Sequence, residues 1–113
     1  MPEAAEKEQE PPHYHGHRDR LRERFLNGGA DALPDYELLE LVLFMAIPRR
    51  DVKPLAKQLL ARFGNLAGVL NAPIPELEKF DGLSENTITA LKAIQASAFR
   101  MMKQEIMHRP ILN

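Results

Sequence analysis

The amino-acid sequence predicts a small all-α domain. Apolar residues recur every three or four positions through most of the chain, and no segment shows the alternating β-branched pattern of a strand. Turn-forming residues bound each apolar stretch, as they do at helix ends. The length of 113 residues, 44% of them hydrophobic, suffices for one domain with a single core and excludes wholesale disorder.

The first two helices are predicted over about 17–27 and 36–45. In the first, Leu21 and Phe25 share one face, and Gly28-Gly29 provides a C-terminal stop. We expect Asp35 to be the N-cap of the second helix. The apolar stripe of that helix is too broad for a surface helix, which predicts that it lies in the core.

The remaining helices follow from the same signals. Asp51 is expected to cap a helix that ends at Phe63, and Gly64 has the position of a left-handed C-cap. Two short helical turns are predicted at 66–70 and 75–80. Ser84 is expected to cap a long last helix over about 85–107, which Pro110 ends.

The net charge of −1 is unevenly distributed. Residues 1–12 contain four glutamates, one lysine and two adjacent prolines, and we interpret them as a flexible acidic tail before a folded domain over 13–113. The rest of the chain is only mildly basic, so any nucleic-acid binding must come from a local patch.

Other residue types are informative by their absence. The sequence has no cysteine, which excludes disulfides, thiolate zinc sites and thiol nucleophiles. No apolar run approaches the ~18 residues of a membrane span, and the start lacks a secretory signal. We therefore expect a cytoplasmic protein that makes no membrane contact.

The segment most typical of a binding function is 77–87, in which a short helix, a turn and a new helix follow one another as in a helix-hairpin-helix. Gly82 allows close approach of a phosphate, the apolar Leu83 follows it, and the amides from Ser84 to Asn86, with the helix dipole, favour an anion. Ser84 replaces the second glycine of the usual pattern, and Glu85 adds a negative charge. A plain helix–helix corner with a serine cap is therefore the alternative.

A second candidate is the segment 47–53, a degenerate first hairpin. Arg49, Arg50 and Lys53 lie near a helix N-terminus, where cations oppose the helix dipole, so an anionic partner explains them better than helix stability does. Two such hairpins would form a pair that straddles the minor groove of duplex DNA. The alternative is a solvated turn in which an arginine pairs with Asp51 or Glu40.

Residues 17–25 form a basic helical segment. Arg18 and Arg22 are four residues apart and share a face, from which they would contact phosphate. The other interpretation, which we favour, is a surface helix that docks through Leu21 and Phe25. In it, Asp19 pairs with Arg22 or Arg24.

Two further groups have ordinary explanations. His13, His15 and His17 alternate, and although His-x-His can ligate a metal, we interpret this segment as a polar linker and expect no metal or cofactor. The methionines of the last helix form either a soft partner-facing surface or, as is commoner, part of the core. They are Met101, Met102 and Met107.

Three blocks of the sequence resemble the N-terminal domain of the bacterial RadC family. They are GHRDRLRERF at 16–25, LPDYELLE at 33–40 and IPRRDVKPLAK at 47–57, and the resemblance runs from about His13 to Arg100. The family is named for DNA repair, and its N-terminal region is similar to a helix-hairpin-helix domain. The resemblance implies a zinc-binding, metalloprotease-like C-terminal half, which these 113 residues do not include, so its hydrolase activity is not carried over.

Two functions are open at this point. The first is a non-catalytic DNA-binding module of a RadC-like repair protein, which contacts the phosphate backbone without strong sequence specificity. The alternative is a protein-interaction or adaptor domain that docks a partner, a second copy or the missing C-terminal half. We expect no enzyme activity, because the chain has no glycine-rich phosphate loop and no paired carboxylates in a plausible cleft; Lys92 is at best a remote catalytic candidate.

Overall fold

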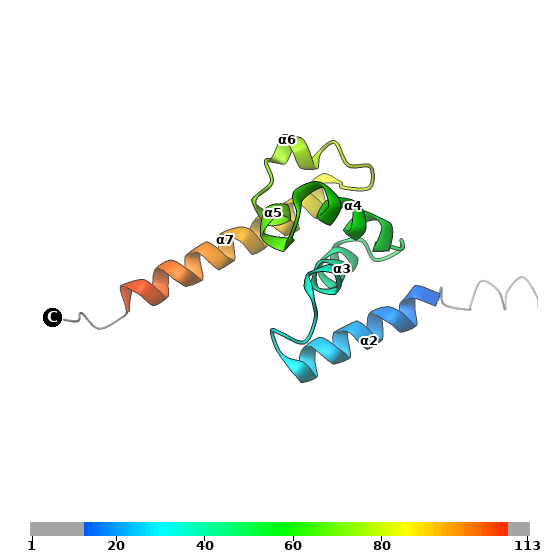
Figure 1. Ribbon diagram of the computed structural model, residues 1–113, viewed down its shortest axis with the longest axis horizontal. Coiled ribbons are helices and arrows are strands. Elements are labelled where there is room, and N and C mark those ends of the chain that lie inside the picture. Colours follow the sequence, from blue (N-terminus) through cyan, green and yellow to red (C-terminus); the bar gives the residue numbers. More distant parts are fainter. Residues whose placement is uncertain (1–12, 109–113) are drawn as a thin grey trace, which may run out of the picture.

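The computed structural model describes residues 13–108, and every regular element in that span is a helix (Figure 1). The helices are α2 (His13–Gly28), α3 (Asp35–Ala46), α4 (Lys53–Phe63), α5 (Leu66–Asn71), α6 (Ile74–Leu77) and α7 (Glu85–Met107). The predicted all-α fold is confirmed. The acidic tail predicted for 1–12 and the stop predicted at Pro110 lie outside the described residues.

Two helix ends are set by the residues that the sequence indicates. Gly64 has a φ of +94°, in the left-handed region that glycine adopts without strain, and its amide donates to the Leu60 carbonyl at 2.8 Å. At the start of α7, Ser84 Oγ accepts a hydrogen bond from the Thr87 amide at 3.3 Å. The predicted end of α4 and the predicted cap of α7 are confirmed.

Two acidic residues do not cap helices as predicted. The N-cap of α3 is Pro34, and Asp35 is the first helical residue. The Asp35 carboxylate instead accepts a hydrogen bond from the Leu66 amide at 3.0 Å. This contact joins α3 to the start of α5. The N-cap of α4 is Val52, so Asp51 lies one position too early, although its Oδ1 accepts from the first helical amide of α4 at 3.1 Å.

The core is built around α3, which contacts α2, α4, α5 and α7. Leu39 and Leu43 of α3 have no exposed surface. Both belong to the one core cluster of the described residues, and burial of one such side chain stabilises the fold by about 1.5–3 kcal/mol. Fully buried leucines from the other helices are Leu21, Leu59, Leu77 and Leu91. The prediction that the second sequence helix lies in the core is confirmed.

The end of the short helix α5 is held in place by α7. α5 and α6 have six and four residues, too few to persist through their own hydrogen bonds. Lys92 Nζ donates to the carbonyls of Leu70 and Ala72 at 2.9 and 2.5 Å, and Gln95 Nε2 donates to Asn71 Oδ1 at 2.7 Å. These bonds tie the end of α5 to the middle of α7.

The two halves of α7 have different surroundings. The first half buries Leu91, whereas every residue over 96–107 is exposed. We call residues 96–107 the distal half of α7; in Figure 1 it extends away from the other helices. Met101, Met102 and Met107 are 62%, 50% and 80% exposed, so the expectation that they fill the core is wrong. The core ends where α5 ends, and the apolar stripe of α7 continues beyond it. No helix within residues 13–108 is long and apolar enough to cross a membrane.

Candidate functional site

The two candidate loops, 47–53 and 81–86, lie side by side. The guanidinium nitrogens of Arg50 lie 3.6 and 3.7 Å from the point where a Cβ on Gly82 would sit. Ile47, Asp51 and Asp81 join Arg50 and Gly82 in lining one cleft of about 170 Å³ between the loops. The fold therefore brings the two candidate segments together.

The turn at Gly82 has the backbone that its sequence predicts. Gly82 has a φ of +96°, which favours glycine. Leu83 is only 8% exposed, and its amide donates to the Phe80 carbonyl at 3.2 Å. Leu83 therefore anchors the turn in the core, so of the predicted contact residues here only Gly82, Ser84 and Asn86 are accessible to a ligand.

The first turn of α7 presents free amide donors. Among residues 13–108, the amides of Ser84, Glu85 and Asn86 donate to no other group, and all three residues are exposed. Such amides, together with the positive end of the helix dipole, attract an anion. The Thr87 amide is already used by the Ser84 cap, so three donors remain.

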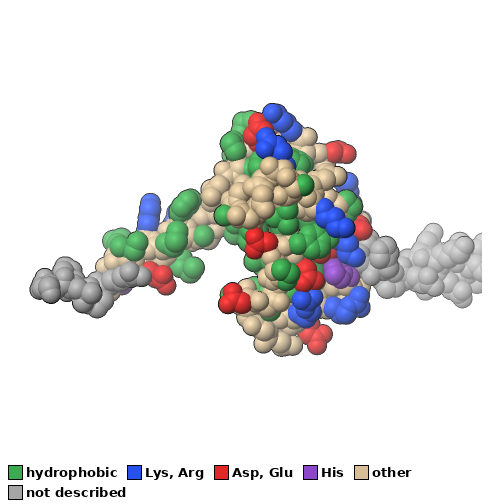
Figure 2. Space-filling view, viewed as in Figure 1, with side chains coloured by type: hydrophobic (Ala, Val, Ile, Leu, Met, Phe, Trp, Pro, Cys, Tyr) green, Lys and Arg blue, Asp and Glu red, His purple; other side chains and the backbone are tan. Residues whose placement is uncertain are grey.

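The charges around these loops nearly cancel. Arg49 and Arg50 are exposed and Lys53 is half-buried, but Asp51, Asp81 and Glu85 lie in the same two segments. In Figure 2, Lys and Arg side chains follow one flank of the molecule, at the right of the view, with acidic side chains among them. Any anion contact here is consequently weak and depends on a few groups.

Arg18 does not belong to this exposed surface, contrary to the sequence interpretation of a phosphate contact. Its side chain is buried, 6% exposed, because the guanidinium serves the α3–α4 loop. It donates to the carbonyls of Pro48 at 2.6 Å, of Ile47 at 3.1 Å and of Arg50. It also lies 5.1 Å from the centre of the Phe44 ring. Arg18 thus fixes the loop that carries Arg49 and Arg50.

Two other arginines of α2, Arg22 and Arg24, also have partners in the protein. Arg22 bonds Asp19 at 2.5 Å, one of the two pairings that the sequence allows, and lies 5.3 Å from the centre of the Phe44 ring. Arg24 forms a two-pronged bond with Glu37, both contacts at 2.9 Å. The hydrogen bond from Arg24 is the main cause that holds the pKa of Glu37 below its ordinary value. The description of α2 as a charge-laced helix docked on α3 agrees with these contacts.

The histidine segment is helical, so the interpretation of His13, His15 and His17 as a linker is wrong for the backbone: α2 begins at His13. His17 is held by a tertiary contact, because its Nε2 lies 2.9 Å from Oε2 of Glu40. Glu40 is 2% exposed, and its Oε1 has no hydrogen-bond partner. Glu40 therefore pairs with a histidine and not with a loop arginine. Among the side chains that the structure describes, no three His, Asp or Glu are grouped to hold a metal ion.

Comparison with known proteins gives one consistent result. The family model described as UPF0758 N-terminal matches residues 15–89. The chain is 54% identical over 103 residues to UPF0758 protein SPO0054 of Ruegeria pomeroyi, covering 91% of this chain and 46% of the relative. It is 52% identical over 93 residues to a UPF0758 protein of Rhodobacter capsulatus, covering 82% and 44%. The chain thus spans about half the length of these curated relatives, and no solved structure matches it.

Proposed function

This chain belongs to the UPF0758 family, which is the RadC family, and from that premise we propose that the domain is a non-catalytic module that contacts the phosphate backbone of DNA. One observation carries the proposal. The basic loop 47–53 and the turn 81–86 lie side by side, so that Arg50 stands over Gly82, two residues before the free amides that begin α7.

The chemistry of the contact follows from those groups. A phosphate oxygen accepts hydrogen bonds from the amides of Ser84 to Asn86, and Arg50 supplies a positive charge at the same place. Arg49 and Lys53 extend the contact to a neighbouring phosphate. Neither loop contributes an element long enough to enter a groove and read base edges, so binding is independent of sequence.

The acidic residues of the two loops limit the strength of this contact. With two or three phosphates neutralised, the logarithm of the binding constant falls with the logarithm of salt concentration at a slope of about −2 to −3. Fluorescence anisotropy of a labelled duplex, titrated with the chain at several salt concentrations, measures that slope.

A pair of double variants tests the proposal. The double variant Arg49→Ala, Arg50→Ala should weaken binding and make the salt slope about 2 less steep, because each lost phosphate contact removes about 0.9 from its magnitude. Arg20→Ala with Arg62→Ala removes the same charge from exposed positions outside both loops and should leave the slope nearly unchanged. Equal losses in the two variants, or no binding at low salt, would overturn the proposal in favour of a protein-interaction role.

A further inference from the structure

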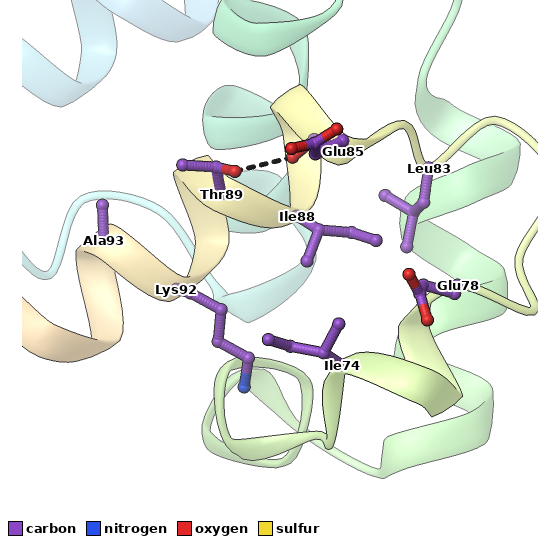
Figure 3. A pocket seen from close by; sticks show the side chains of 8 residues that line it. All are labelled: Ile74, Glu78, Leu83, Glu85, Ile88, Thr89, Lys92 and Ala93. Carbon is purple, nitrogen blue, oxygen red and sulfur yellow. Dashed lines mark hydrogen bonds between the residues drawn. The ribbon is translucent and has the colours of Figure 1, made fainter.

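Of the residues that line a groove between α6 and the first half of α7, only Glu85 also belongs to the proposed DNA contact, through its backbone amide. The groove has a volume of about 810 Å³, and Ile74, Leu83, Ile88 and Ala93 give it an apolar lining (Figure 3). Ile74, a large apolar residue, is 48% exposed. A groove of this kind on the surface is typical of a docking site for an apolar helix.

The groove is also acidic. Glu78 and Glu85 contribute carboxylates to its lining. Lys92 is the one basic residue among the lining residues, and its ammonium is already bonded to the carbonyls of Leu70 and Ala72. An occupant that fits this groove therefore combines apolar side chains with positive charge.

The distal half of α7 has that composition. Phe99, Ile106 and Met107 are 51%, 65% and 80% exposed. Arg100 and Lys103 lie among them, against a single acidic residue in the distal half. In Figure 2 this part of the helix carries several green side chains that no other element covers. It is an apolar and basic helix segment that is exposed along its whole length, although Ala98, Phe99 and Met102 also line a pocket beside the end of α5.

We propose that the chain forms a two-fold dimer in which the distal half of α7 of each copy lies in the groove of the other. Lys103 and Glu85 are 18 residues apart, which is five turns at 3.6 residues per turn, so they lie on the same face of α7 about 27 Å apart. In an antiparallel pair centred between them, Lys103 of each copy lies opposite Glu85 of the other, twice per dimer.

The same register also places apolar residues of each distal half against the groove of the other copy. Phe99 lies one turn before Lys103, and the antiparallel register sets it opposite Thr89 in the lining of the groove. Ala93 and Ala96 lie near the two-fold axis, where small side chains allow the two helices to approach closely. A two-fold arrangement fills both grooves and leaves no open end for further copies.

Sedimentation equilibrium of the chain at neutral pH over about 1–500 μM tests the dimer. Lys103→Glu and Glu85→Lys should each raise the dissociation constant about tenfold or more, since each change replaces two attractive pairs with two repulsive ones. The double variant should recover most of the affinity, which a mere effect on helix stability would not do. Lys57→Glu, at an exposed position on α4, should leave the dissociation constant unchanged.

Phe99→Asp provides a test that does not depend on the charges. Phe99 is half exposed, so the fold should persist, as circular dichroism will check, while the dimer is lost. A monomer at all concentrations would overturn the proposal, as would a dimer that ignores Phe99→Asp or a double charge variant that does not recover. Binding of the groove by the C-terminal half of a UPF0758 relative, with no dimer of this chain, would also overturn it.

Discussion

Replacing Arg18 with methionine should destabilise the fold more than any exposed arginine change. Methionine keeps most of the apolar stem but loses the guanidinium, together with its contact over the Phe44 ring. The carbonyls of Ile47, Pro48 and Arg50 then lose a charged donor. Because the side chain is 6% exposed, water reaches these carbonyls only after the loop moves.

The size of the effect follows from the number of bonds. A hydrogen bond from a charged group contributes about 1.5–3 kcal/mol. In the variant, water partly replaces the lost donor once the loop moves, so the net loss for the three bonds together is about 3 kcal/mol. For a domain of this size, each kcal/mol lowers Tm by about 4–8 °C, so we expect a fall of about 12–24 °C. Thermal unfolding followed by circular dichroism measures it, with urea unfolding as a second assay.

Two further variants test whether the guanidinium bonds cause the loss of stability. Arg18→Lys keeps the charge but supplies one compact donor group, so its loss should be intermediate. Arg20→Met changes an exposed arginine on the same helix and should alter Tm little. If Arg18→Met stays within about 0.5 kcal/mol of the parent, a surface-like value, the three bonds do not hold the loop and the reasoning is refuted.

Three other predictions concern stability. Gly68→Ala should lower the free energy of unfolding by about 2–3 kcal/mol in urea, because the new Cβ would lie 2.0 Å from the Phe63 carbonyl oxygen. Gly16→Ala, at an exposed helical position, should instead raise it by about 0.5–1 kcal/mol. Equal effects of the two changes would contradict this prediction. Ser84→Ala should cost about 1 kcal/mol, and Ser84→Asp should recover most of it, if the cap of α7 acts as described. Arg24 lowers the pKa of Glu37, so the stability that this pair contributes is present above the ordinary carboxyl pKa of 4.5 and is lost as pH falls through the lower folded value. Glu37→Gln should therefore reduce the fall in the urea midpoint between about pH 6 and pH 3. An unchanged fall would exclude this pair as a cause of the pH dependence.

The helices were predictable where a local signal decides. Ser84 and Gly64 act through their own backbones and immediate neighbours, so sequence alone locates both helix ends. Asp35 shows the limit of that reasoning: its carboxylate was expected to cap α3, but a tertiary partner 31 residues away takes it. The start of α2 was missed for the opposite reason, because polar histidines carry no apolar periodicity.

The candidate site was predictable only in parts. The residues of both loops were identified, but their proximity depends on how α3 packs against α4 and α7, which no local pattern encodes. Arg18 was assigned to an external phosphate because a basic residue on a helix looks exposed in sequence. The acidic groove was missed because Glu78 and Glu85 belong to different elements; an alternation of acidic and apolar residues around Gly82 was the available signal.

The bonds from Lys92 and Gln95 to the end of α5 have a consequence for how the domain opens. The six residues of α5 are too few to form a stable helix alone, and Lys92 and Gln95 of α7 lose their hydrogen-bond partners when the end of α5 detaches. Segment 66–77 and the first half of α7 therefore behave as one cooperative unit. The turn at Gly82 lies inside that unit, so its amides keep their arrangement until the whole unit unfolds.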